Sequence, residues 1–501
     1  MLPKFLAVHG LIVATFAIGD PARNPVVELG PAGTYMGVSE NHGTVQSWKG
    51  ISYAQPPLGD LRFMPPNPLP PQPTGVFSLA PYGVHNAYLG PGSLGTEDCL
   101  KLYVWKLTTA KKGDKLAVVV FVHGGGLIFG SAAQDDFGDW VSHDQNFIAV
   151  SLNYRLGILG FLNHPEQPSA NAGLLDQRMA MRWVKENIAA FGGNPDGITI
   201  MGQSGGGWAI LAHLVLYDGC HNGTFQKAIV RSAQREPMFN IKELKLRNEA
   251  LFNHKGKLAN VPTIAGSTSD EGFDGYLDAH QRNPTPRNTT RLDPSTNRIT
   301  NLTDEHVNKI ATFYKVNATY GSTAQDNFFL NSFRAYLMAF GLFGEVGIFG
   351  SERLVGRWMS AKHGPQNVWT YRFNAPTVGT KYGKSLYPLA PVQHSAENSY
   401  LDSPLSSMTR FKRAIAAEFR SYISSFIRTG NSNTYRLDSA PFWPCYGGLG
   451  DFFNSPVRLV TQFAFSSNTN KTYSTSTQIE AAQKAGLERT GYWQTDESIR
   501  F

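Results

Sequence analysis

The 501-residue chain has few cysteines and no strong excess of either charge. It contains only Cys99, Cys220 and Cys445, with no C-x-x-C pair and no His/Cys cluster at metal-ligand spacing. An odd number of cysteines cannot be fully paired, and the sequence gives no support for metal catalysis. The formal net charge of +7 is small for this length and is not gathered into basic runs. We therefore expect no metal, no cofactor and no nucleic-acid partner.

The sequence also lacks linkers rich in Gly, Ser or charge, fixed-period repeats and low-complexity tracts. We therefore predict one large domain over residues 20–501. The apolar stretch 5–18 is too short for a membrane span, and small residues follow it. Residues 1–19 are thus interpreted as a secretory signal peptide, and the protein as secreted. Five N-x-S/T sequons agree with a secreted glycoprotein: Asn222, Asn288, Asn301, Asn317 and Asn470.

One serine stands among four glycines in MGQSGGGWAI, residues 201–210. The run ITIM (198–201) before it is typical of a buried strand, and WAILAHLVL (208–216) after it is typical of a buried helix. Glycines allow close backbone approach where a Cβ would clash. A serine on such a strand-to-helix turn is exposed at the end of a sheet, over a helix N-terminus that favours negative charge. Ser204 is therefore the candidate nucleophile.

A second glycine cluster provides candidate donors for an oxyanion. KLAVVVFVHGGGLIFG (115–130) predicts a buried strand that runs into a histidine and three glycines. A tight turn needs one glycine or two, whereas three leave several amides unshielded, as in the oxyanion loops of lipases and esterases. We assign the oxyanion hole to the amides of Gly125 and Gly126, together with that of Gly205 after the serine.

Several ordered segments run from about residue 26 to PFWPCY (441–446). They include WKGISYAQPPLGDLRF (48–63), TEDCLKLYVW (96–105), SLNYRLGILGFL (151–162), NAGLLDQRMAMRWVKENIAAFGGNPDGITIMGQSGGG (171–207) and FQKAIVRSA (225–233). These segments resemble the type-B carboxylesterase and lipase family, which includes the cholinesterases, and fungal-type carboxylesterases most of all. The resemblance implies an α/β-hydrolase fold, with a central, mostly parallel sheet and helices on both faces.

The resemblance also implies the other members of a catalytic triad. In VPTIAGSTSDEGF (261–273) it makes Glu271 the acid rather than Asp270, and in APVQHSAENSY (390–400) it makes His394 the base. The order serine, acid, histidine is that of this fold. Ser232 and Glu397 match supporting positions only. Two further pairs match buried ion pairs of the family: Arg62 with Glu97, and Arg155 with Asp176.

The chain departs from the family pattern in three places. Cys99 matches a disulfide-forming cysteine, but no cysteine precedes it. Leu89 stands where cholinesterases have a tryptophan that stacks on the cationic substrate group, which argues against choline esters. Glu271 follows Ser204 by only 67 positions, about half the family spacing. The segment near 234–260 is therefore shortened, either in an open-pocketed protein or in a sequence that lacks an exon.

The sequence thus predicts a serine hydrolase that cleaves small carboxylic esters through an acyl-enzyme, without a stable membrane span. No long amphipathic helix is evident between Arg62 and Cys99. A carboxylesterase is therefore favoured over a triglyceride lipase with a lid. The shortened segment is also compatible with a catalytically impaired binding relative or with a truncated product. We expect an unusually open acyl side beside the triad.

Overall fold

The computed structural model describes most of the chain before residue 268 and parts of the remainder. The described residues are 24–72, 75–78, 95–162, 171–233, 258–268, 350–375, 392, 394–446, 457–465 and 473–481. Leu89, Glu271, the interpreted signal peptide and the shortened segment lie outside them, as do all the sequons except Asn222. The predictions about these features stay predictions.

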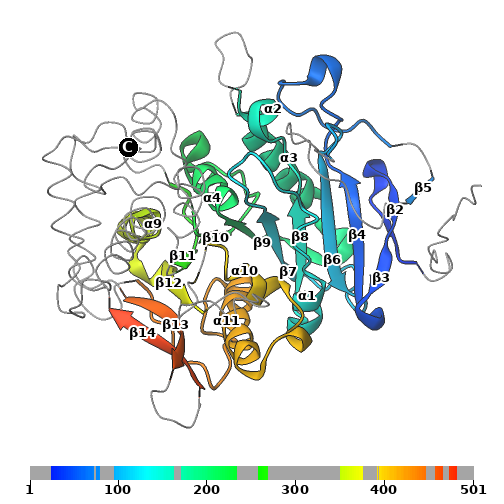
Figure 1. The fold of residues 1–501 in the computed structure, drawn as a ribbon. Coiled ribbons are helices and arrows are strands. Elements are labelled where there is room, and N and C mark those ends of the chain that lie inside the picture. Colours follow the sequence, from blue (N-terminus) through cyan, green and yellow to red (C-terminus); the bar gives the residue numbers. More distant parts are fainter. Residues whose placement is uncertain are drawn as a thin grey trace, which may run out of the picture.

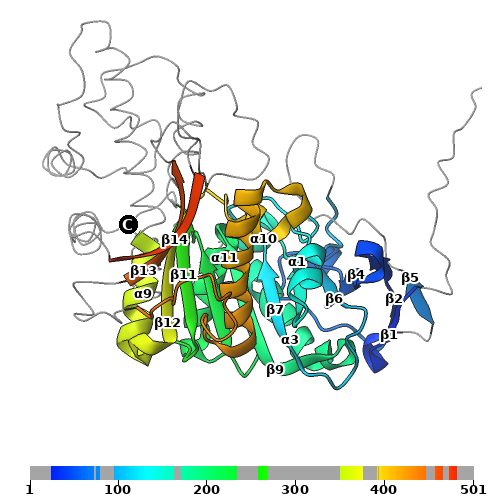
Figure 2. The ribbon, with the colours of Figure 1, turned by 90° about the horizontal axis from the view of Figure 1, so that it is seen from below.

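A large twisted sheet runs through the molecule (Figures 1 and 2). Its strand order is β14-β13-β12-β11-β10-β9-β7-β8-β6-β4-β3, and a separate small sheet has the order β1-β2-β5. Neighbouring strands from β8 through β13 pair in parallel, whereas β3, β4, β6 and β14 pair antiparallel at the two sides. The bounds in the large sheet are β3 Val38–Glu40, β4 Val45–Ser52, β6 Lys101–Leu107, β7 Leu116–Val122, β8 Phe147–Leu152, β9 Gly193–Gln203, β10 Lys227–Arg231, β11 Thr263–Thr268, β12 Val368–Asn374, β13 Val457–Phe465 and β14 Tyr473–Ala481; those in the small sheet are β1 Val26–Glu28, β2 Thr34–Met36 and β5 Val76–Ser78.

Helices cover both faces of the large sheet (Figure 2). The α-helices are α1 Gly138–Asp144, α2 Gly157–Phe161, α3 Ala172–Asn187, α4 Gly205–Val215, α9 Gly350–His363, α10 Asn398–Asp402 and α11 Arg410–Thr429. Short 3₁₀ turns lie at η2 Gly30–Ala32, η3 Asn41–Gly43, η4 Gly59–Leu61, η5 Ile188–Phe191, η6 Leu216–Gly219, η9 Pro365–Asn367 and η10 Leu405–Ser407. This arrangement confirms the predicted α/β-hydrolase fold class.

The apolar residues of the strands alternate between two cores. In β7, Val118, Val120 and Val122 belong to the core under α3, α4 and α9, whereas Val119 and Phe121 belong to the core under α1, α10 and α11. Successive side chains of a strand point to opposite faces. A strand covered on both faces therefore carries a continuous apolar run, which is what the sequence 116–122 shows.

The parallel strands bring distant segments to one edge of the sheet. The turn after β7 carries His123 and the glycines, Ser204 follows β9, and Ser232 follows β10. β9 lies between β7 and β10. In open α/β sheets, sites form outside the carboxyl ends of the strands. The turns that carry Ser204, Ser232 and the glycines lie at one edge for that reason.

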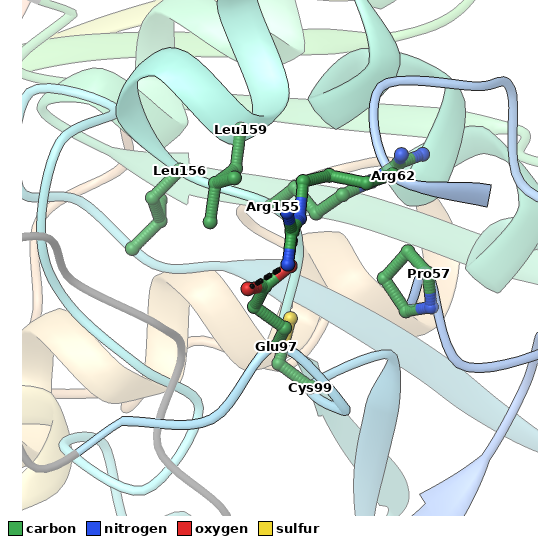
Figure 3. A pocket seen from close by; sticks show the side chains of 7 residues that line it. All are labelled: Pro57, Arg62, Glu97, Cys99, Arg155, Leu156 and Leu159. Atoms are coloured by element: carbon green, nitrogen blue, oxygen red, sulfur yellow. Dashed lines mark hydrogen bonds and ion pairs between the residues drawn. The ribbon is translucent and has the colours of Figure 1, made fainter. Parts of the chain in front are cut away.

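The two predicted ion pairs differ in burial. Arg155 and Asp176 are 3% and 0% exposed and lie 2.6 Å apart, as predicted. The prediction of burial is wrong for Arg62 and Glu97, whose side chains are 44% and 27% exposed at 2.6 Å. The Arg62–Glu97 pair is therefore partly covered by protein and partly exposed to solvent. It borders a cavity of about 10 Å³ that also touches Arg155 (Figure 3), which is room for no more than one water molecule.

The cysteines and the described helices give two further results. Cys99 is buried, Cys220 exposed and Cys445 half-buried, and none of the three forms a disulfide bond. Cys99 therefore does not anchor the segment before it covalently. Within the described ranges, no helix combines the length and the apolar character that a membrane crossing requires.

Candidate active site

Ser204 occupies a strained turn between β9 and α4. Its φ of 58° and ψ of −124° lie outside the regions that side chains ordinarily adopt. Its amide donates to the Arg231 carbonyl at 2.9 Å, and its own carbonyl accepts from the Trp208 amide at 2.9 Å. These bonds tie the turn to β10 and to the first turn of α4. The surrounding structure thus keeps Ser204 in its strained conformation. Such conformations persist only when neighbouring contacts fix them in this way.

The glycines around the serine allow backbone segments to touch. A Cβ on Gly202 would overlap with the carbonyl of Gly206, and a Cβ on Gly206 would overlap with the carbonyl of Val122. A Cβ on Gly207 would come 2.6 Å from the Arg231 carbonyl oxygen. The glycines after the serine belong to α4 rather than to a loop, so the helix begins earlier than its apolar run suggests.

His394 reaches Ser204 from a segment far along the chain. The Nε2 atom of His394 lies 2.7 Å from the Oγ atom of Ser204. Ser204 is 6% exposed, so the hydroxyl is close to the base and largely shielded from water. This is the hydrogen bond that a histidine needs to accept the proton of a serine nucleophile.

The glycine turn after β7 lies beside the serine. A Cβ on Gly205 would come 2.9 Å from the amide nitrogens of Gly126 and Leu127, so these amides surround the start of α4. Gly125 and Gly126 have φ values of 99° and 60°, which glycine adopts most readily. Within the described residues, neither of their amides donates to an acceptor. They are thus available for an oxygen of a bound molecule.

His123 at the start of this turn has a structural place. Its ring stacks on Tyr154 with 4.5 Å between centroids, and the Tyr154 hydroxyl donates to the His123 carbonyl at 3.0 Å. Burial lowers the pKa of His123 to about 4, so its ring is neutral at ordinary pH. It supports the turn and carries no charge toward the site.

A buried polar network lies around Ser232, the residue after β10. The Ser232 hydroxyl donates to Oε1 of Glu397 at 3.1 Å, and the same carboxylate lies 3.9 Å from Nε of Arg231. Glu397 is 0% exposed. Ser232 and Glu397, which the resemblance assigns to supporting positions, thus bond to each other.

A pair of carboxyl groups adjoins this network. Burial is the main cause that raises the pKa of Asp135, to about 6, and the nearby Arg231 cation opposes it. Burial, followed by the charge of Asp135, raises the pKa of Asp402 well above its usual range. Burial and mutual repulsion thus disfavour a negative charge on both carboxyl groups of this pair.

Sequence reasoning missed the role of Gln203, the residue directly before the serine. Its side-chain Nε2 donates to Oγ of Ser395 at 2.7 Å and lies 3.4 Å from Nε2 of His394. Its position inside G-x-S-x-G was the available signal. The motif gives no reason to expect a contact with a residue 192 positions away.

Glu271, the predicted acid, follows β11 by three positions and lies outside the described residues. β11 itself is present at Thr263–Thr268, within the segment VPTIAGSTSDEGF (261–273). The structure thus brings Ser204, His394 and the glycine amides together. The third member of the triad and the predicted open acyl side stay predictions. Within the described part of the chain, no group of three or more His, Cys, Asp or Glu residues could hold a metal ion.

Comparison with known proteins agrees with this geometry. The model of the carboxylesterase family matches residues 25–252. The pyrethroid hydrolase Ces2a of Mus musculus is 37% identical over 215 residues, which are 40% of this chain and 38% of that protein. The para-nitrobenzyl esterase of Bacillus subtilis (strain 168) is 34% identical over 275 residues, which are 50% of this chain and 53% of that protein.

A solved structure extends the similarity beyond these segments. The crystal structure of Aspergillus niger EstA matches with a TM-score of 0.74 and 26% identity, over 95% of this chain and 99% of that one. The chain spans 38% and 53% of the two curated relatives named above. The family match includes Ser204 and the oxyanion glycines and ends before Glu271 and His394. Over residues 25–252 the chain thus matches the carboxylesterase family, and its ordered motifs and its fold agree with that match.

Proposed function

We propose that this protein hydrolyses carboxylic esters, with Ser204 as nucleophile, His394 as general base and acid, and Glu271 as the residue that orients the imidazole. The observation that carries the proposal is the 2.7 Å contact between His394 Nε2 and Ser204 Oγ at a strained strand-to-helix turn. A pair of this kind, beside free glycine amides, has the parts that acyl transfer requires.

In the first half of the reaction, Ser204 Oγ attacks the carbonyl carbon of the ester while His394 Nε2 takes the hydroxyl proton. The carbonyl oxygen becomes an oxyanion and accepts hydrogen bonds from the amides of Gly125, Gly126 and Gly205. When the tetrahedral intermediate collapses, the bond to the alcohol oxygen breaks. The proton passes from His394 to the departing alcohol, and the acyl group stays on Ser204.

In the second half, water attacks the acyl carbon and gives its proton to His394. The second tetrahedral intermediate uses the same glycine amides, and its collapse releases the carboxylic acid and returns the proton to Ser204 Oγ. The balance is one ester and one water converted to one acid and one alcohol. The steps use side chains and backbone amides only.

For the substrate we propose small neutral esters. The acetylcholinesterase of Electrophorus electricus is 36% identical over 231 residues, which are 42% of this chain and 36% of that protein. This chain carries Leu89 at the position of the cholinesterase tryptophan. Without an aromatic face, a quaternary ammonium group gains no cation–π attraction. Butyrylthiocholine is therefore not preferred to a neutral thioester of equal size.

The test is hydrolysis of p-nitrophenyl butyrate by the purified chain, together with labelling by a fluorophosphonate probe. Ser204→Ala should lower turnover by several orders of magnitude and abolish labelling, because the nucleophile is lost while the oxyanion donors remain. Ser142→Ala is a matched control, since Ser142 lies on α1 and its hydroxyl bonds to Thr44 at the surface. The proposal would be refuted if the fluorophosphonate still labelled Ser204→Ala. It would also be refuted if the fluorophosphonate did not label the unaltered protein.

A further inference from the structure

The side chain of Gln203 joins three parts of the site that are distant in sequence. It is the last residue of β9 and is 3% exposed. Its Nε2 atom lies 2.7 Å from Ser395 Oγ and 3.4 Å from His394 Nε2. A buried amide with such partners is fixed in one orientation, because losing a partner would leave a polar group unsatisfied.

The other side of the same amide lies against the oxyanion turn. A Cβ on Gly124 would come 2.9 Å from Oε1 of Gln203 and 2.8 Å from its backbone oxygen. The absence of a side chain at Gly124 therefore makes room for the glutamine. Gln203 thus lies between the turn after β7 and the segment of the catalytic histidine.

The histidine segment has a conformation that needs such a fixed partner. Ser395, directly after His394, has a φ of 68°, which is uncommon for a residue with a side chain. Its hydroxyl accepts the hydrogen bond from Gln203, and its neighbour His394 is aimed at Ser204. A change of conformation at Ser395 would turn the imidazole away from the nucleophile.

From these contacts we propose that Gln203 is a positioning residue for the catalytic base: its neutral amide holds Ser395, and through it His394, in reach of Ser204. The inference rests on the proposed esterase function and adds a residue to it. Gln203 does not itself exchange a proton with the substrate.

The neutrality of Gln203 has its own consequence for the base. A carboxylate at this distance would attract the imidazolium and raise the pKa of His394. An N–H donor instead favours the unprotonated Nε2, the form that accepts the serine proton. Among the described residues, the ionisable groups near the His394 segment include the buried Arg231 and Glu397, with Asp135 and Asp402 next to Arg231. The variants below leave these residues unchanged, as they do Glu271.

Four variants of the full-length chain test the positioning role. Gln203→Met keeps the length and removes the amide, and Ser395→Ala removes its partner. Gln203→Glu keeps the link, because the Ser395 hydroxyl can donate to a carboxylate, but adds a charge. Gln226→Glu is the matched control: it adds the same charge directly before β10, at the opposite end of the sheet, and its Oε1 acceptor contact with the Ile198 amide can persist.

The kinetic readout is kcat and KM for p-nitrophenyl butyrate across pH. Gln203→Met and Ser395→Ala should each lower kcat by about 10- to 100-fold with little change in KM, the effect of a misplaced catalytic group. The double variant should lose no more than either single one, because both remove the same link. Gln203→Glu should recover most of kcat at high pH, with the acid limb moved up by about one pH unit or more. Gln226→Glu should resemble the unaltered protein.

A second readout does not depend on turnover. The imidazole Cε1 proton of His394 can be titrated by NMR and assigned by its absence in His394→Asn. Its midpoint should rise in Gln203→Glu and stay unchanged in Gln226→Glu. An unchanged midpoint in Gln203→Glu, or additive losses in the double variant, would overturn the positioning role. An unaltered protein that neither hydrolyses esters nor takes the fluorophosphonate would refute the function instead, and the titration would still test the contact.

Discussion

At the scale of single residues, the site depends on positions where a side chain does not fit. The carbonyl of Val122, at the end of β7, lies where a Cβ of Gly206 would be. Gly206 is in the first turn of α4, so this contact sets how closely the helix approaches the oxyanion turn. The distance between Ser204 and the glycine amides therefore depends on the absence of a side chain at Gly206.

We predict that Gly206→Ala displaces α4 and weakens both the fold and the site. Overpacking of this kind costs about 1–3 kcal/mol of unfolding free energy, and a small shift of Ser204 lowers turnover by about 100-fold. Urea unfolding and the rate of fluorophosphonate labelling measure the two effects. Gly138→Ala is the control, because its nearest atom is the movable Oδ1 of Asp136 at 3.0 Å. Equal stability and equal labelling rates in both variants would show that the backbone contact at Gly206 controls neither the position of α4 nor that of Ser204.

The sequence identified the glycines and the serine but not the contacts of Gln203. A strand, a serine flanked by glycines and a helix are consecutive, so their local geometry follows from neighbours in the chain. The contact between Gln203 and Ser395 depends on how the His394 segment returns to the sheet and on the positive φ of Ser395. No local pattern around residue 203 encodes either.

At the scale of elements, two arginine–carboxylate pairs that look alike in sequence stabilise the fold to different degrees. Arg155, after β8, bonds to both carboxylate oxygens of Asp176 on α3, and its Nη1 also donates to the Met64 carbonyl at 2.7 Å. Arg62 and Glu97 make two similar bonds, at 2.6 and 2.7 Å, but face solvent on one side. Burial depends on which distant segments cover each pair, and the sequence does not show that.

We therefore predict that Asp176→Asn is strongly destabilising and Glu97→Gln is nearly neutral. The first leaves the Arg155 cation buried without its counter-charge, which costs about 3–5 kcal/mol of unfolding free energy. The second breaks a pair that water already screens. Urea denaturation of both variants at neutral pH is the measurement. A similar loss in the two would mean that the burial of Arg155 does not control its contribution.

At the scale of the whole molecule, the order of the strands places the site. Ser204 and His394 are 190 positions apart and meet because parallel strands align their carboxyl ends at one edge. The apolar runs predicted buried strands, and the ordered motifs predicted the fold. Spacing alone could not select His394 among thirteen histidines; the resemblance to the family did so. The order and register of the strands could not be predicted from the sequence and come from the structure.

That register also limits where the acid of the triad can come from. Gln203 pairs with Arg231, and Arg231 pairs with Gly266, so β9, β10 and β11 end at nearly the same level. Two strand spacings, about 10 Å, separate β9 from β11. The three residues from Thr268 to Glu271 can span about 10 Å when extended. The length of chain between β11 and Glu271 is therefore comparable to the spacing between β11 and β9.

We predict that Glu271→Gln lowers kcat for p-nitrophenyl butyrate by about 10³- to 10⁴-fold with little change in KM, because the imidazole then loses the partner that fixes its tautomer and stabilises its charged form. Asp270→Asn is the matched control: it removes the neighbouring carboxylate and should change kcat by less than about threefold, as expected for a residue outside the triad. Circular dichroism confirms that both variants are folded. A large loss in Asp270→Asn with an active Glu271→Gln would transfer the role to Asp270. Full activity in both variants would show that the chain after β11 does not orient His394, and that the short connection after Ser204 has separated the acid from the site.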